Sequence, residues 1–193
     1  MGVVRRITPP SSLPGMPAPG AGFEAPFDML AACHDRVARM LALLTRLQQH
    51  LVERGRDEAA RQAARDVMRY FDLAAPLHHQ DEELHVFPPL LAGTDAALTA
   101  LVQRLVQDHR DMERAWPLAR KVLLGIADDP APDWAPLTSG QSLALNSFAA
   151  LYARHMEDED HLVYPAAHAA LTSDALQSMS QDMMQRRGVR AIQ

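Results

Sequence analysis

Residues 78–88 read HHQDEELHVFP, and residues 155–165 read HMEDEDHLVYP. An offset of 77 residues superposes His78 on His155 and Glu82 on Glu159, so that each stretch contains the pattern His-x-x-x-Glu. In a helix, positions i and i+4 lie on the same face, with their Cβ atoms about 5–6 Å apart. Each stretch therefore predicts an imidazole and a carboxylate that point in the same direction.

Apolar residues around these stretches recur every three, four or seven positions, as on one face of a helix. The spacing predicts one helix over 27–53, a second capped by Asp57, a third after residues 93–95 and a fourth from Ser139 to Pro165. No stretch alternates as a strand would. We predict an all-α fold: an up-down-up-down antiparallel four-helix bundle over residues 26–172, a disordered or extended Pro/Gly-rich tail over 1–25, and a short C-terminal helix and tail over 173–193.

Two lone histidines complete the repeat, because His34 and His109 lie 75 residues apart on the first and third helices. Antiparallel helices place two residues at one level when both lie equally far from the intervening turn. The midpoints between successive histidine positions fall at about residues 57, 93–94 and 133, and each is a predicted turn. Six residues are therefore predicted to share one level of the bundle: His34, His78, Glu82, His109, His155 and Glu159.

Buried together, two carboxylates and four imidazoles would be strongly destabilising without a compensating cation. Imidazole and carboxylate are ligands that iron, manganese and zinc sites use, so we interpret this level as a metal site. The alternative is a ferritin-like di-iron bundle, which uses Glu-x-x-His on two helices. Glu82 and His85 have that spacing, whereas the second copy offers only Asp158 and His161.

The pattern resembles the hemerythrin-like, or HHE cation-binding, family over about residues 27–171. The resemblance implies a non-haem centre of two iron ions joined by an oxo or hydroxo bridge, with Zn or Mn as substitutes. It implies that the four histidines bind terminally and that Glu82 and Glu159 bridge the ions. Where the oxygen carriers of the family have a second histidine on the third helix, this chain has Glu113. The ligand set is more similar to that of bacterial members that handle nitric oxide, peroxide or iron-sulfur cluster repair.

The resemblance implies a protein that binds or senses O2, NO or reactive oxygen species, or that handles iron. The alternatives are a di-iron enzyme that reduces nitric oxide or peroxide, and an iron donor in iron-sulfur cluster repair. Whether the chain is an enzyme stays open at this point, because all of these functions would use the same ligands. The expected partner is a diatomic molecule or peroxide, and a homodimer is an open alternative.

Composition excludes other classes of function. The net charge of −5 argues against nucleic acid as a partner, and no apolar run is long enough to cross a membrane. The single cysteine, Cys33, and the absence of a signal peptide favour a cytoplasmic protein. Glu113, His79 and Tyr152 are possible additional ligands or outer contacts of the site. His50 and His168 are expected to lie away from it.

Overall fold

The structure is a computed structural model that describes residues 25–128 and 136–189, and within these ranges it contains helices and no strand. The prediction of an all-helical fold is thus confirmed for this part of the chain. The predicted tail, except for Ala25, lies outside the described residues. The elements in chain order are α1 (Pro26–Arg54), α2 (Glu58–Asp81), η1 (Glu82–Val86), α3 (Phe87–Leu91), α4 (Ala96–Asp128), α5 (Ser139–Ala150), α6 (Tyr152–Asp158), η2 (Glu159–Val163), α7 (Tyr164–Ala170) and α8 (Ser173–Arg186).

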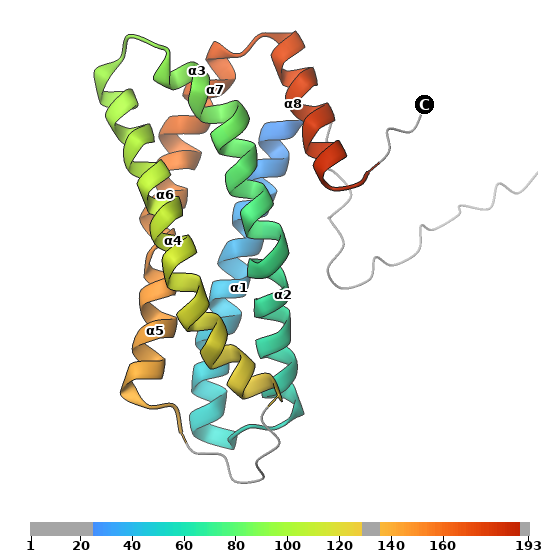
Figure 1. The fold of residues 1–193 in the computed structure, drawn as a ribbon, viewed down its shortest axis with the longest axis vertical. Coiled ribbons are helices and arrows are strands. Elements are labelled where there is room, and N and C mark those ends of the chain that lie inside the picture. Colours follow the sequence, from blue (N-terminus) through green and yellow to red (C-terminus); the bar gives the residue numbers. More distant parts are fainter. Residues whose placement is uncertain (1–24, 129–135, 190–193) are drawn as a thin grey trace, which may run out of the picture.

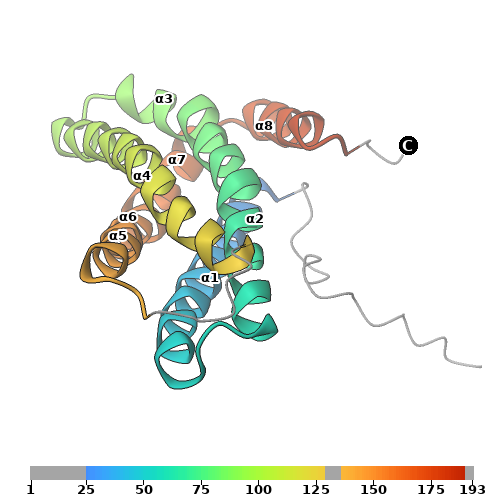
Figure 2. The same cartoon turned by 60° about the horizontal axis from the view of Figure 1, so that its bottom comes forward.

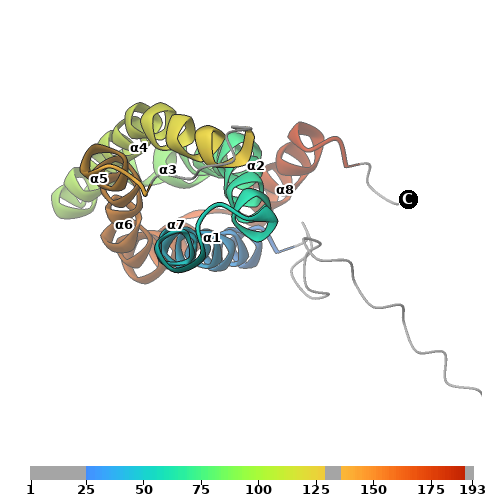
Figure 3. The ribbon, with the colours of Figure 1, turned by 90° about the horizontal axis from the view of Figure 1, so that it is seen from below.

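The helices form long rods that lie side by side (Figure 1). The first rod is α1, the second runs from α2 through η1 to α3, the third is α4, and the fourth runs from α5 to α7. Seen from below, the rods surround the centre of the molecule (Figure 3). Rods that follow one another in the chain are packed together, and α1 also contacts α5. The centre of this helical bundle is therefore reached by side chains from every rod.

The turns between the first rods are fixed by local chemistry. The first helix ends at Gly55, whose positive φ of 73° lies in the left-handed region that a glycine adopts without strain. The side chain of Asp57 then accepts a hydrogen bond from the amide of Ala60 and caps α2. Asp95 accepts hydrogen bonds from the amides of Ala97 and Leu98 at the start of α4. These positions agree with the turns that the sequence predicts.

Two separate apolar clusters fill the bundle. The larger one includes Val37, Phe71 and Phe148, and the smaller one includes Leu30 and Val86. His34 lies between Leu30 and Val37 in the sequence of α1, so that a polar layer separates the two clusters. Apolar packing on both sides holds the helices that contribute to this layer, and it keeps bulk water away from their buried polar groups.

The second and fourth rods each contain a π-helical turn, which the apolar spacing of the sequence does not predict. These turns, η1 and η2, begin at Glu82 and Glu159, the two glutamates of the repeat. The amides of Phe87 and Tyr164 each donate to a carbonyl five residues earlier. The next residue in each copy is a proline, which has no amide proton to continue the α-helical pattern. Such π-turns are frequent at functional sites.

The last helix, α8, lies outside the four rods and packs on α1 and α2 (Figure 2). Its Met179 and Met183 are buried in the smaller apolar cluster. Arg186 and Arg187 form ion pairs of 2.6 Å with Asp81, a carboxylate with no exposed surface. Because an unpaired buried charge is costly, these arginines fix the position of α8. Within the described ranges, no helix is long and apolar enough to cross a membrane.

Candidate metal centre

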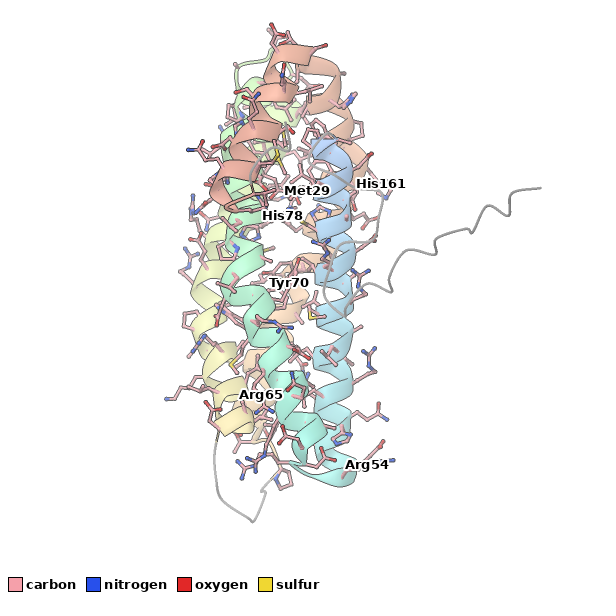
Figure 4. All side chains as sticks on the ribbon, turned by 90° about the vertical axis from the view of Figure 1, so that its right-hand side faces the viewer. Met29, Arg54, Arg65, Tyr70, His78 and His161 are labelled. Atoms are coloured by element: carbon pink, nitrogen blue, oxygen red, sulfur yellow. The ribbon has the colours of Figure 1, made fainter. Side chains whose placement is uncertain are left out.

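The six residues predicted to share one level form two overlapping groups, each buried and each containing both glutamates. In each group the potential ligand atoms lie within 4.8 Å of one another. The first group comprises His34, His78, Glu82 and Glu159, and the second comprises Glu82, His109, His155 and Glu159. Figure 4 labels His78 on α2, above Tyr70 on the same helix. The structure thus brings together every residue of the predicted ligand set.

The first group is built around two imidazole nitrogens. The Nε2 atom of His34 lies 3.2 Å from Oε2 of Glu159 and 3.9 Å from Oε1 of Glu82. His78 Nε2 lies 3.3 Å from the same Oε1 of Glu82. The two rings meet edge to face, with their centroids 4.8 Å apart. One oxygen of each glutamate therefore faces this pair of histidines.

The second group repeats this arrangement on the other half of the site. The Nε2 atoms of His109 and His155 are 3.1 Å apart. His109 Nε2 lies 3.4 Å from Oε2 of Glu82, and His155 Nε2 lies 3.1 Å from Oε2 of Glu159. Each glutamate consequently contacts both pairs of histidines.

The donor set fits a cation site, because several buried carboxylate oxygens have no hydrogen-bond partner. Glu82 and Glu159 have no exposed surface. Oε2 of Glu82 and both carboxylate oxygens of Glu159 are buried without a hydrogen-bond partner. Buried carboxylate oxygens without a partner are expensive, and most folds avoid them unless a cation compensates the charge. The residues of this site therefore suit a metal centre with nitrogen and oxygen ligands.

Carboxylates outside the two groups orient three of the four histidines. The Nδ1 of His34 donates to Asp160 at 2.8 Å, and the Nδ1 of His109 donates to Glu83 at 2.9 Å. His155 Nδ1 lies 3.5 Å from Asp108. Such contacts fix the ring and leave the opposite nitrogen free to bind an ion.

Glu83 and Asp160 occupy equivalent places in the repeat, one residue after Glu82 and Glu159. Neither residue was predicted from the sequence to contact the site. The signal that could have found them is the second acidic residue in each copy of the pattern. Each copy thus supplies a glutamate to the centre of the site and a carboxylate to a histidine of a neighbouring rod.

In the metal-free chain, two of the histidines carry positive charge and partly compensate the buried glutamates. Burial lowers the pKa of His34, but the hydrogen bond with Asp160 and the nearby carboxylate of Glu159 outweigh burial and raise the pKa to about 10. In the same way, burial lowers the pKa of His109, and its contacts with Glu82 and Glu83 raise it to about 9. Two imidazolium groups therefore face the glutamates at neutral pH, and a metal ion must displace their protons.

The possible additional residues take different positions. His79 is buried, and its ring stacks on His109 with centroids 4.0 Å apart. Burial holds the pKa of His79 well below its ordinary value, so the ring is neutral. Tyr152 is buried among Phe71 and Phe148 in the larger apolar cluster. Glu113 is exposed, forms an ion pair with Arg110 and belongs to neither group.

The remaining histidines lie outside both groups. His50 pairs with Asp57 near the turn between α1 and α2, and His85 pairs with Asp182 on α8. His161 is exposed at the outer side of the fourth rod (Figure 4). His168 is exposed and lines an open pocket of about 570 Å³ together with Phe27 and Asp160. The ferritin-like alternative, which needs a ligand at His85 or His161, is not favoured by these positions.

Tyr164 also lies at the site, although its role was not predicted from the sequence. Its hydroxyl donates a hydrogen bond to Oε1 of Glu82 and lies 3.1 Å from Nε2 of His34. Its ring stacks on His34. Burial raises the pKa of this hydroxyl well above its ordinary value, as do the charges of Glu82 and Glu159. The metal-free side chain is therefore neutral.

Comparison with known proteins agrees with the geometry. The protein-family model described as the hemerythrin HHE cation binding domain matches residues 25–167 of this chain. The chain belongs to this family. The hemerythrin-like chain is also similar to an uncharacterized protein of Haemophilus influenzae, with 29% identity over 170 residues that cover 88% of this chain and 94% of the relative. The resemblance predicted from the repeat is thereby confirmed, and the buried His/Glu cluster is compatible with metal binding, as the family description indicates.

Proposed function

We propose that this hemerythrin-like chain holds two iron ions and uses them to bind or sense O2, NO or reactive oxygen species. The observation that carries the proposal is the pair of buried groups that share Glu82 and Glu159. In the proposed centre, His34 and His78 hold one ion, and His109 and His155 hold the other. Both glutamates bridge, within an up-down-up-down antiparallel arrangement of the four rods.

Two iron ions in such a site would supply a reversible change between ferrous and ferric states and would bind a small ligand. The chain itself would supply the rest of the function. Asp160 and Glu83 orient His34 and His109, and the apolar clusters on both sides exclude bulk water. A cavity of about 60 Å³ is lined by His79 and Met112. None of the six ligand residues lines this cavity, which lies next to the site through His79, whose ring stacks on His109.

The test is anaerobic stopped-flow spectroscopy of the di-ferrous protein mixed with O2, NO or peroxide, with the iron content measured beforehand. A binding or sensing protein should give a stable adduct whose formation is reversed when the ligand is removed. Continuous consumption of NO or peroxide would instead support the enzymatic alternative. A reconstituted chain that holds no iron, or holds iron without any spectral response to the three ligands, would refute the proposal.

The carboxylates that orient the histidines should strengthen metal binding. We expect Glu83→Gln and Asp160→Asn each to lower iron affinity by about 10- to 100-fold, because each removes the charged acceptor of one ligand histidine. Chelator competition measures the affinity, and circular dichroism checks that the helices persist. Glu113→Gln is the matched control, since Glu113 pairs with Arg110 away from both groups. Equal affinities in the three variants would contradict the assigned role.

Iron affinity should rise with pH through the neutral range. His34 and His109 hold protons in the metal-free chain up to pH values of about 10 and about 9, and binding must displace them. Raising the pH toward these values removes the competing protons, so affinity should increase by up to about tenfold per pH unit for each displaced proton. Anaerobic ferrous titrations at several pH values test this.

The same pKa shifts predict the opposite trend for the stability of the metal-free chain. A raised histidine pKa contributes stability that is fully present below the unfolded value of about 6.5 and is lost as the pH passes the folded value. The metal-free chain should therefore lose stability progressively as the pH rises from about 6.5 through the folded pKa values of about 9 and about 10. Asp160→Asn removes one cause of the raised pKa of His34. It should therefore reduce both the rise of iron affinity with pH and the loss of metal-free stability with pH.

An iron affinity that does not change with pH would show that metal binding displaces no proton.

A further inference from the structure

The two halves of the site are related by the repeat but differ by one hydroxyl group. The offset of 77 residues aligns Phe87 with Tyr164. Both rings stack on the lone histidine of another rod: Phe87 on His109 with centroids 5.7 Å apart, and Tyr164 on His34 with centroids 5.3 Å apart. The interplanar angles of 25° and 17° are similar. Ring packing is therefore common to both halves, and packing alone does not account for the tyrosine.

The extra oxygen lies among the potential ligand atoms of the first half. Tyr164 Oη is 3.1 Å from His34 Nε2 and is hydrogen-bonded to Glu82 Oε1. Bonds of about 2.0–2.2 Å from one ion to donors at right angles place those donors about 3 Å apart. His34 Nε2 and Glu159 Oε2 have this spacing, at 3.2 Å. The hydroxyl of Tyr164 has it as well, so that it stands in the position of a further ligand.

Neither exposure to solvent nor ring packing accounts for this hydroxyl. The side chain is 6% exposed, so the oxygen is not placed for solvation. Its partners are a histidine and a glutamate that both belong to the proposed metal site. Phe87 shows that the position tolerates a ring without a hydroxyl in the other half. Phenolate oxygen is an established protein ligand of ferric iron, as in haem enzymes with an axial tyrosine.

We propose that Tyr164 is a seventh ligand of the centre, binding through Oη to the ferric ion held by His34 and His78. This inference rests on the proposed function, because it requires iron at the site. When the iron–oxygen bond forms, the O–H bond breaks and the proton leaves to solvent, with no electron transferred. The two ions are then unequal, since the half with His109 and His155 has Phe87 in the corresponding place.

The test is the visible spectrum of the full chain loaded with ferric iron. Tyrosinate bound to ferric iron gives a broad charge-transfer band, and excitation into that band enhances the tyrosine ring vibrations in the Raman spectrum. We expect the wild-type chain to show both signals and Tyr164→Phe to lose both. The chain has three tyrosines, so Tyr70→Phe and Tyr152→Phe are matched controls that should keep the signals.

Iron content, measured on each sample, separates the two proposals. A wild-type chain that holds two ferric ions without a tyrosinate signal would overturn the role of Tyr164 and leave the proposed function intact. A signal that survives in Tyr164→Phe would also overturn it. If Tyr164→Phe holds no iron, the wild-type spectrum and the two control variants still decide the question. A wild-type chain that binds no iron would overturn both proposals together.

Discussion

Replacing Glu82 or Glu159 by glutamine should reduce iron content from about two ions per chain to fewer than one. Each glutamate contacts histidines of both groups, so that one substitution removes a negative ligand from two ions at once. A neutral amide has nearly the same shape as the carboxylate but does not offer two anionic oxygens. Elemental analysis after anaerobic reconstitution measures the loss. No other single substitution in the chain is expected to affect both ions so strongly.

Glu157→Gln is the matched control, because Glu157 lies in α6 two residues before Glu159 and is exposed. This variant should retain its iron. Circular dichroism of the metal-free variants should show unchanged helix content, because the glutamine side chains keep the volume of the layer between the two apolar clusters. If Glu82→Gln and Glu159→Gln hold as much iron as Glu157→Gln, the two glutamates do not bridge.

The common level of the six candidate ligands was predictable because it depends only on residue spacings, which can be counted along the sequence. The distance of His34 and His78 from the turn at Gly55 sets their level, and the i,i+4 spacing of His78 and Glu82 sets their common face. Apolar periodicity sets which face is buried. None of these requires knowledge of how side chains pack, so simple helix geometry places the six residues together.

Other features depend on details that periodicity does not contain. A π-turn adds one residue to a helix without altering the apolar pattern enough to be recognised. Its only sign here is a proline at position 88 that recurs at position 165. The hydroxyl of Tyr164 was missed because an aromatic residue before a proline has the same apolar pattern whether it is Phe87 or Tyr164. The role of this oxygen can be recognised only once the positions of His34 and Glu82 around it are known.

The metal-free chain should unfold at a markedly lower temperature than the iron-loaded chain. Without iron, the imidazolium groups of His34 and His109 and the hydroxyl of Tyr164 compensate Glu82 and Glu159 in part, and three carboxylate oxygens have no hydrogen-bond partner. An ion that binds the folded chain alone stabilises it by about 2.7 kcal/mol at 100 times its dissociation constant and about 4.1 kcal/mol at 1,000 times. For a chain of this size, each kcal/mol shifts the melting temperature by about 2–4 °C.

Calorimetry under anaerobic conditions, at one pH and with increasing ferrous iron, measures this shift. The melting temperature should rise by roughly 5–15 °C and should continue to rise as iron exceeds its dissociation constant, because stabilisation grows with the logarithm of ligand concentration. Glu82→Gln should lose most of the shift, whereas His168→Ala should keep it, since His168 lies outside both groups. A melting temperature that is the same with and without iron would mean that the buried carboxylates are compensated by the chain itself.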